Sequence, residues 1–279
     1  MKLLRYGEAG CEQPGLLDSE GNVHSLAELI NDIDGPTIAS GRLQEIDTSQ
    51  LPVVPEPGRL GPCVANAGKF ICIGLNYADH AAESGMPIPS EPEVFTKAIS
   101  AICGPNDDII QPRDSDKLDW EVELALVIGR PASYVTSGDA EDCIFGYMVC
   151  NDVSERGFQL ERGSQWDKGK GCDTFGPIGP WLVTKDEIAD PNDLTMWLDV
   201  NGKRYQDGST KTMIFKPAFI VEYLSRFMSL QPGDIISTGT PPGVGLGLKP
   251  PTYLKPGDVV SLGIEGLGEQ RQTVVAHQS

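Results

Sequence analysis

The sequence predicts a mixed α/β fold that is rich in β-strands, with a small N-terminal domain over residues 1–60 and a larger domain over residues 61–279. The 279 residues are roughly twice the length of an average domain, which leaves room for two units. Apolar residues make up 39% of the chain and charged residues 22%, as in ordinary globular proteins. Glycine (32) and proline (22) are frequent and follow no collagen period, which indicates many turns between short strands.

The small N-terminal unit is predicted to contain a strand, a turn and a short helix. We assign these to Met1–Tyr6, Asp18–Asn22 and Ser25–Ile33 respectively. The hydroxyl of Ser25 suits a helix N-cap, because it can accept a hydrogen bond from the first helical turn. The proline-rich segment Leu51–Gly61 is expected to be a linker. No group of residues in this unit suggests chemistry.

The larger unit alternates short apolar runs with turn residues. Strands are predicted at Phe70–Gly74, Trp120–Gly129 and Phe145–Asn151. Helices are predicted over Asn76–Ser84, from Gly138 to Cys143, and over Pro217–Phe227, where proline is tolerated in the first turn. Two Pro-Gly-Asp turns, at residues 232–234 and 256–258, each precede an apolar strand.

Charge and cysteine usage exclude several classes of protein. The formal net charge of −18 repels phosphate backbones, so a general nucleic-acid binder is not expected. No run of residues approaches the roughly 20 apolar residues of a membrane span, and the first residues lack the apolar core of a signal peptide. The seven cysteines contain no C-x-x-C pair. We therefore expect a soluble cytoplasmic protein with free thiols.

The first chemical signal is a pair of glutamates on one predicted strand, Glu121 and Glu123. Residues two apart point to the same face of a strand, so these carboxylates lie side by side and repel each other. A hard divalent cation such as Mg²⁺ or Mn²⁺ would relieve the repulsion. The alternative is a half-exposed strand with a solvated glutamate face. Asp152, at the exit of the next predicted strand, offers a third carboxylate, and Asp119 could be a neighbour of the site or a surface residue.

The second signal is His80, one of only three histidines. If Asn76–Ser84 is helical, His80 and Glu83 are three residues apart and can touch. A carboxylate on one ring nitrogen fixes the tautomer and raises the basicity of the other, which makes a general base. The alternative is an incidental pair on a surface helix.

Several motifs, in order along residues 68–270, resemble those of the fumarylacetoacetate hydrolase family. The runs that carry this resemblance are Ile73-Gly74-Leu75-Asn76-Tyr77 with His80 and Glu83, Asp119-Trp120-Glu121-Val122-Glu123-Leu124, Asn151-Asp152-Val153-Ser154, Lys170-Gly171-Cys172-Asp173-Thr174-Phe175 and Thr238-Gly239-Thr240-Pro241-Pro242-Gly243. The resemblance implies a β-roll or sandwich, a homodimer and one Mg²⁺ per subunit, with Mn²⁺ or Ca²⁺ as alternatives.

The resemblance also implies a role for each site residue. Glu121, Glu123 and Asp152 would bind the metal. His80, Glu83 and Lys170 would be catalytic, the first two as a dyad that activates water. The expected substrate contacts are Tyr77, Gln159, Gly239 and Thr240. One departure concerns Gly157, which stands where many relatives carry an aspartate, so any pocket contact from that position is in question.

The expected reaction is hydrolysis of a carbon–carbon bond in a small anionic keto acid of the 2,4-dioxo type. The run from Phe158 to Lys170 resembles a narrower branch that cleaves 2,4-diketo-3-deoxy-L-rhamnonate or its fuconate epimer to pyruvate and a second small acid. Ureidoglycolate lyase and oxaloacetate decarboxylase activities on the same scaffold are the alternatives. A binding protein without activity is disfavoured, because every expected metal and dyad position is filled.

Overall fold

The computed structural model describes residues 1–79, 87–163 and 165–278, and most of its described strands lie in two packed β-sheets. In the described residues the larger sheet has eleven strands, in the order β4-β3-β2-β1-β15-β12-β11-β18-β6-β7, with β5 also paired to β1. These strands are β1 (Lys2–Tyr6), β2 (Gln13–Leu17), β3 (Val23–Ser25), β4 (Val53–Val54), β5 (Leu60–Gly61), β6 (Phe70–Gly74), β7 (Glu93–Thr96), β11 (Val122–Ile128), β12 (Ile144–Asn151), β15 (Leu182–Thr184) and β18 (Ile235–Ser237). The mixed, strand-rich fold predicted from the sequence is confirmed.

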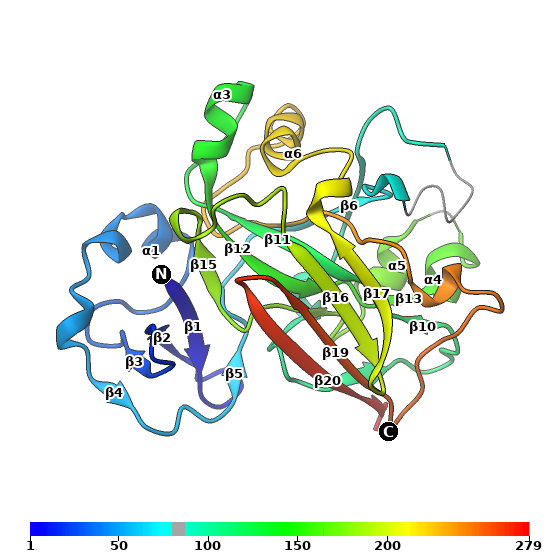
Figure 1. The fold of residues 1–279 in the computed structure, drawn as a ribbon, viewed down its shortest axis with the longest axis horizontal. Helices are drawn as coiled ribbons and strands as arrows, with labels where there is room; N and C mark the ends of the chain where they lie inside the picture. The colour runs from blue at the N-terminus through cyan, green and yellow to red at the C-terminus, as the bar shows by residue number, and fades with distance from the viewer. Residues whose placement is uncertain (80–86, 164, 279) are drawn as a thin grey trace.

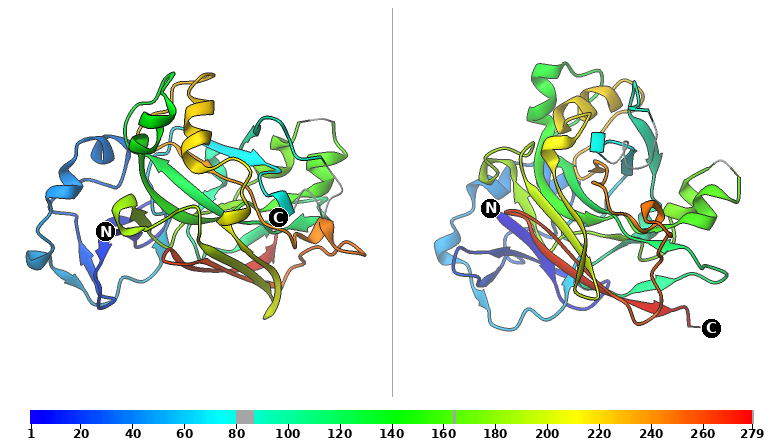
Figure 2. Two further views of the ribbon diagram at one scale, coloured as in Figure 1. Left: turned by 45° about the horizontal axis from the view of Figure 1, so that its top comes forward. Right: turned by 45° about the vertical axis from the view of Figure 1, so that its right-hand side comes forward.

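The smaller sheet has five described strands in the order β17-β16-β19-β20-β9. They are β9 (Ile109–Gln111), β16 (Thr195–Val200), β17 (Lys203–Ser209), β19 (Val259–Ile264) and β20 (Gly268–Ala276). Two short pairs complete the strands: β10 (Leu118–Asp119) with β13 (Ser154–Glu155), and β8 (Ile102–Cys103) with β14 (Gly176–Pro177). Figure 1 shows the smaller sheet crossing in front of β11 and β12, and Figure 2 shows the same layering from two other directions.

Helices are short and lie at the edges of the sheets. The α-helices with described bounds are α1 (Gly35–Ala39), α3 (Ser137–Ala140), α4 (Arg156–Leu160), α5 (Asp167–Lys170) and α6 (Pro217–Leu224). Single 3₁₀ turns are η1 (Arg42–Glu45), η2 (Thr48–Gln50), η3 (Ile99–Ala101), η4 (Glu141–Cys143), η5 (Lys185–Glu187), η6 (Thr210–Thr212) and η7 (Gly245–Gly247). Figure 1 places α3 and α6 together at one end of the molecule, and α4 and α5 at another. None of the helices in the described part of the chain is long and apolar enough to cross a membrane.

Strand β11 separates two hydrophobic cores. On one face, Leu124 and Leu126 pack in the cluster that also holds Met196 of β16 and Leu262 of β19. On the other face, Ala125 lies in a second cluster that reaches the N-terminal strands. This alternation follows from the two-residue period of a strand, and it places the side chain of Glu123 on the same face as Ala125.

The N-terminal unit continues the larger sheet. β1 pairs with β15 through Lys2↔Val183 and Leu3↔Leu182, and the side chains of Leu3, Leu16 and Leu26 lie in the second cluster. The proline-rich segment that we expected to be a linker contains the short strands β4 and β5, which pair with β3 and β1. The division at residue 60 stays a prediction.

The helix predicted at Ser25–Ile33 is wrong. Ser25 ends β3, and only a single turn follows, in which the amides of Leu29 and Ile30 both donate to the carbonyl of Leu26. The helix begins later, at Gly35, because Asp34 caps the amide of Thr37 at 3.0 Å and a proline occupies its first turn. Leu26, Ile30 and Ile33 are nevertheless buried, so the apolar pattern was read correctly as core but wrongly as helix.

Most of the other predicted elements are found, several of them with shifted bounds. The strands predicted at Phe70–Gly74, Trp120–Gly129 and Phe145–Asn151 are β6, β11 and β12, and both Pro-Gly-Asp turns precede strands, β18 and β19. α3 and η4 cover the predicted start at Gly138, and α6 is shorter than predicted. Most of the helix predicted at Asn76–Ser84 lies outside the described residues. All seven cysteines are free thiols, as expected.

Candidate metal centre and active-site pocket

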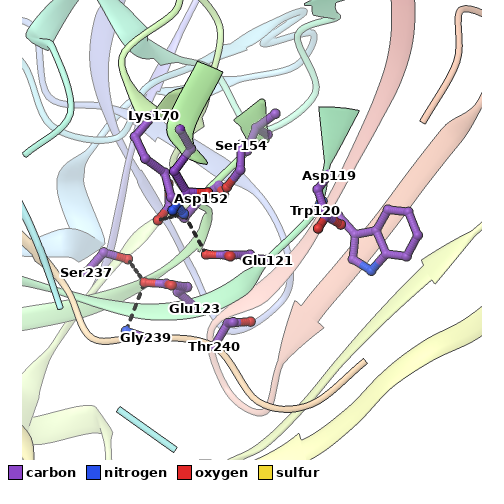
Figure 3. Close-up of polar contacts among 12 residues, drawn as sticks. Asp119, Trp120, Glu121, Glu123, Asp152, Ser154, Lys170, Ser237, Gly239 and Thr240 are labelled. Atoms are coloured by element: carbon purple, nitrogen blue, oxygen red, sulfur yellow. Dashed lines mark hydrogen bonds and ion pairs between the residues drawn. The ribbon is translucent and has the colours of Figure 1, made fainter. Parts of the chain in front are cut away.

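Strand pairing brings three carboxylates from two adjacent strands into one buried cluster. Glu123 lies on β11, Glu121 immediately before it, and Asp152 immediately after β12. The amide of Asp152 donates to the carbonyl of Glu121 at 2.9 Å, which aligns the two strand ends. One oxygen from each side chain lies within 4.8 Å of the others, and all three residues are buried. Figure 3 shows the three side chains converging, while Trp120 points away from them.

Three cations surround two of the acids. The ammonium of Lys170 lies 2.9 Å from Glu121 Oε2 and 2.7 Å from Asp152 Oδ2. Lys97 pairs with the other oxygen of Asp152. Arg156 Nη2 lies 2.6 Å from Glu121 Oε1. Burial would raise the pKa of Glu121, but Lys170 and Arg156 outweigh it and hold that pKa well below its usual value.

Glu123 is the acid without a cationic partner in the described part of the chain. Its Oε2 accepts hydrogen bonds from the hydroxyl of Ser237 at 2.5 Å and from the amide of Gly239 at 2.9 Å. Burial raises the pKa of Glu123 well above its ordinary value, and the charges of Asp152 and Glu121 raise it further. A divalent cation would remove this repulsion, and three oxygen donors within one small buried space suit a hard ion. The residues present therefore fit a divalent metal.

Lys170 itself is held in its charged form. Burial would lower the pKa of its ammonium, but Asp152 and Glu121 outweigh burial and the net shift is upward. Its ammonium also lies 5.1 Å from the ring centroid of Phe95, within the range of a cation–π contact. Lys170 is thus a fixed positive charge at the edge of the acidic cluster.

A cavity of about 840 Å³ opens on this cluster. Glu121, Glu123 and Lys170 lie at its wall together with residues from several other segments of the chain. The remaining described lining residues are Ile73, Gly74, Leu75, Phe95, Arg156, Gln159, Leu160, Trp166, Gly239, Thr240, Val244, Leu246, Gly247, Leu248, Lys249 and Pro251. A space of this size accommodates a small organic acid.

The structure brings most of the predicted substrate contacts to this cavity. Gln159, Gly239 and Thr240 line it. Their polar groups already have protein partners: Gln159 Oε1 accepts from Arg156, the amide of Gly239 donates to Glu123, and the hydroxyl of Thr240 donates to the carbonyl of Val122. Their roles as substrate contacts stay predictions.

Tyr77 is not among the described residues that line the cavity. Its side chain is fully buried in the core, where its hydroxyl lies 3.2 Å from the sulfur of Met196, and its backbone bridges to Met213. Its role as a substrate contact stays a prediction. His80 and Glu83 lie outside the described residues, so the catalytic dyad stays a prediction.

Sequence reasoning missed two charged residues of the site, Arg156 and Lys97, and left the position of a third, Asp119, open. Arg156 bridges Glu121 and Asp119, and Lys97 is a fully buried partner of Asp152. Asp119, for which the sequence allowed either a place beside the site or a place on the surface, is buried. Its carboxylate accepts hydrogen bonds from the amides of Gly245 and Leu246 at 2.6 and 2.9 Å. Arg156 follows Asp152 by only four residues, and this short separation could have indicated that it belongs to the site. The sequence around Lys97 contains no pattern that indicates a role for this lysine.

Comparison with known proteins places the chain in a family. Residues 69–275 match the family described as fumarylacetoacetate (FAA) hydrolase, C-terminal. The chain belongs to the fumarylacetoacetate hydrolase family. A relative from Burkholderia multivorans, which bears the provisional name of a hydrolase, is 59% identical over 276 residues, 98% of each chain. Membership of this family, together with a relative that bears the provisional name of a hydrolase, confirms the prediction that the protein is an enzyme.

Solved structures of the fumarylacetoacetate hydrolase family share the whole fold. The fumarylacetoacetate hydrolase of Exiguobacterium antarcticum is 37% identical, with a TM-score of 0.91, covering 99% of this chain and 100% of its own. The 5-carboxymethyl-2-hydroxymuconate delta-isomerase of Mycobacterium smegmatis is 34% identical, with a TM-score of 0.80 and full coverage of both chains. The maleylpyruvate hydrolase of Sphingobium sp. SYK-6, solved with manganese(II) and pyruvate, is 27% identical, with a TM-score of 0.82 and full coverage of both.

Proposed function

We propose that the protein is a divalent-metal-dependent hydrolase that cleaves a carbon–carbon bond of an acylpyruvate, a 2,4-dioxo acid. The observation that carries the proposal is the buried cluster of Glu121, Glu123 and Asp152, whose two glutamates line a pocket. The related maleylpyruvate hydrolase, which holds Mn²⁺ and pyruvate, supports both the metal and a pyruvate product. The partner of this site is therefore a small anionic keto acid.

The proposed reaction adds one water across the bond between C3 and C4. An acylpyruvate R–CO–CH₂–CO–COO⁻ and water give R–COO⁻, pyruvate and one proton. The oxygen of water bonds to C4, the C3–C4 electron pair moves toward the C2 carbonyl oxygen, and C3 is then protonated to the methyl group of pyruvate. Negative charge therefore develops on the pyruvate half, which is where a positive environment is needed.

The site residues divide between binding and proton transfer. A bound dication would supply positive charge for the carboxylate and the 2-oxo oxygen of the substrate. Lys170 places a second positive charge beside Glu121 and Asp152, so it stabilises the same developing charge. We propose that His80, oriented by Glu83, takes the proton from water.

Several finer statements belong to this proposal. We propose Mg²⁺ as the metal, with Mn²⁺ or Ca²⁺ as substitutes, because hard oxygen sites discriminate weakly between these ions. We also propose a cytoplasmic homodimer. Titration with each ion tests the choice of metal. Sedimentation of the metal-loaded protein tests the oligomeric state.

The identity of the acyl group separates the competing activities. The sugar acids 2,4-diketo-3-deoxy-L-rhamnonate and its fuconate epimer are the substrates that the narrower resemblance suggests. Oxaloacetate decarboxylation forms the same pyruvate enolate without attack by water, whereas a ureidoglycolate lyase releases urea and glyoxylate, also without attack by water. An isomerase is a further candidate, since the isomerase of Mycobacterium smegmatis shares the fold over its full length. Assay of one metal-loaded preparation against all of these compounds distinguishes them.

Two substitutions separate metal binding from proton transfer. Glu121→Gln and His80→Ala should both lower turnover at least about 100-fold. Only Glu121→Gln should weaken Mn²⁺ binding, because it removes a charged ligand, and His80→Ala should bind Mn²⁺ and oxalate normally. Calorimetry measures both, with Glu161→Gln, an exposed glutamate, as the control. Full-strength Mn²⁺ binding by Glu121→Gln would overturn the ligand assignment.

A further inference from the structure

The described polar side chains of the cavity gather at the acidic cluster, apart from Lys249, and the rest of the lining is mostly apolar. Its described polar side chains are Glu121, Glu123, Arg156, Gln159, Lys170, Thr240 and Lys249. The first six hydrogen-bond or pair with protein groups around the acidic cluster, and Lys249 is exposed to solvent. The rest of the described lining therefore offers few groups that could satisfy the hydroxyls of a bound molecule.

Two aromatic residues form one apolar wall beside Lys170. The rings of Phe95 and Trp166 lie 5.5 Å apart, tilted by 59°. A Cβ atom on Gly74 would lie only 2.7 Å from the indole of Trp166, so the indole packs directly on the backbone of Gly74. Only glycine at position 74 permits this approach, and the aromatic wall is thus held in place by the strand below it.

Leucines at the mouth of the cavity are exposed without an evident packing role. Leu160 is 49% exposed and Leu246 is 37% exposed, although both line the cavity. Their backbones are fixed: Leu160 lies on α4, whose amide at Phe158 is capped by Glu155 at 2.5 Å, and the amide of Leu246 donates to Asp119. Exposed apolar side chains gathered at a cavity are characteristic of a binding surface.

From this lining we infer that the acyl group of the substrate is an apolar alkyl or aryl arm rather than a polyhydroxylated chain. The inference rests on the proposed function, because the acidic end of the cavity must take the pyruvate half. The arm then extends from Lys170 past Phe95 and Trp166 toward Leu160 and Leu246. A sugar-acid arm would instead place hydroxyls against these side chains and lose hydrogen bonds to water. The apolar lining therefore argues against the rhamnonate-type substrates.

Binding of uncleavable ligands tests the arm without turnover. Pyruvate and 2-oxooctanoate lack a C4 carbonyl, so the Mn²⁺-loaded protein can bind them without hydrolysis. We expect 2-oxooctanoate to bind at least about tenfold more tightly than pyruvate, since each buried methylene adds affinity. The double variant L160N/L246N should lose about tenfold in affinity for 2-oxooctanoate and change that for pyruvate by less than about threefold. Calorimetry measures both ligands.

Leu29→Asn is the matched control, because Leu29 is also 49% exposed but lies in the N-terminal unit away from the cavity lining. It should keep the wild-type ratio of affinities. Equal affinity of the wild type for the two ligands, or an unchanged ratio in L160N/L246N, would overturn the inference.

Kinetics separates this inference from the proposed function. We expect the wild type to cleave 2,4-dioxooctanoate with a kcat/KM at least about tenfold above that for 2,4-diketo-3-deoxy-L-rhamnonate. A preference for the sugar acid would refute the apolar arm and leave the hydrolase proposal intact. If neither compound is cleaved, the hydrolase proposal fails, and the affinities for the uncleavable ligands still decide whether the cavity takes an apolar arm.

Discussion

Glu123 differs from its two neighbours in how its charge is balanced. Each oxygen of Glu121 and Asp152 faces a cation, while Glu123 receives only a hydroxyl and an amide. Glu123 therefore depends on an added cation to stabilise its ionised form. Lys170 is the protein group nearest to supplying that charge, since it already bridges the other two acids.

Lys170→Met should separate catalysis from metal binding. We expect kcat for the preferred acylpyruvate to fall at least about 100-fold, because a positive charge beside the developing negative charge is lost. The affinity for Mn²⁺ should stay equal or increase, because the ammonium no longer competes for the carboxylate oxygens. Steady-state kinetics and calorimetry measure the two effects. The control is Lys168→Met on the same helix, where the lysine is exposed and its ammonium donates to the carbonyl of Arg162. Loss of Mn²⁺ binding by a folded Lys170→Met protein would contradict the assignment.

A second residue-scale prediction concerns the pair His24–Asp18. His24 Nε2 lies 2.9 Å from Asp18 Oδ2, and Nδ1 lies 3.1 Å from the carbonyl of Leu51, so both ring nitrogens face acceptors. The hydrogen bond to Asp18 raises the pKa of His24, whereas hydrogen bonds from Asn22, and next from His24, lower the pKa of Asp18. Protonated His24 therefore stabilises the fold below its ordinary pKa of 6.5, and this contribution disappears as pH rises through its raised value. The Asp18 contribution is present above 3.8 and is lost on acidification.

The pair should thus stabilise the fold most between about pH 4 and 6.5. The difference in Tm between the wild type and His24→Gln should be larger at about pH 5.5 than at about pH 8.5. Thermal denaturation at the two pH values measures it, with His277→Gln in the C-terminal tail as the control. A difference that grows with rising pH would show that the pair has no such role.

At the scale of elements, β17 reaches across to the site through Gln206. Its Oε1 accepts the amide of Val122 at 2.9 Å, and its Nε2 donates to the hydroxyl of Thr240 and the carbonyl of Pro241, both at 2.8 Å. The side chain thus ties the strand of the acids to the segment that carries Gly239 and Thr240. It does so where β11 and β18 are no longer paired, since their register ends at Ala125↔Ser237.

Gln206→Leu should destabilise the fold by about 2–4 kcal/mol, because it leaves a buried amide and a buried carbonyl without partners. Chemical denaturation measures the free energy of unfolding, and Gln44→Leu, at an exposed position, should change it little. Metal affinity should also fall in Gln206→Leu if the strand shifts. An unchanged unfolding free energy would show that water satisfies these groups.

The elements that the sequence predicted well are those whose own residues determine them. β11 was predictable because its apolar side chains alternate between two faces, each of which packs in a core. β18 and β19 were predictable because a Pro-Gly-Asp turn precedes each of them. The helix at Ser25–Ile33 was not, because a buried apolar pattern of that length suits a turn as well as a helix. The charged partners Arg156 and Lys97 were missed for a related reason: their neighbours in space come from elsewhere in the chain.

At the scale of the whole molecule, one sheet joins the N-terminal unit to the strands of the site. Leu3 and Leu16 from β1 and β2 share a cluster with Val127 and Met148 from β11 and β12. Sequence patterns could not predict this order of strands, because β18 lies between β11 and β6 and β1 pairs with β15, across separations that local periodicity does not encode.

A protein containing only residues 61–279 should not fold as a stable unit. Removing β1 would expose the edge of β15 and the apolar side chains that face Leu3 and Leu16, which favours aggregation. We expect little soluble protein and no cooperative thermal transition by circular dichroism, with the full chain as reference. A fragment that unfolds cooperatively and binds Mn²⁺ would instead support an independent domain from residue 61.

The burial of β11 on both faces has a consequence for how new substrate preferences could arise. A change of register in this strand would disturb two cores and three acids at once, so laboratory evolution should rarely accept mutations there. The segments that carry Leu160 on α4, Trp166 and Leu246 on η7 contact the cavity without that constraint. Randomised libraries confined to these segments should yield altered selectivity, whereas libraries on the strand should yield mostly inactive protein.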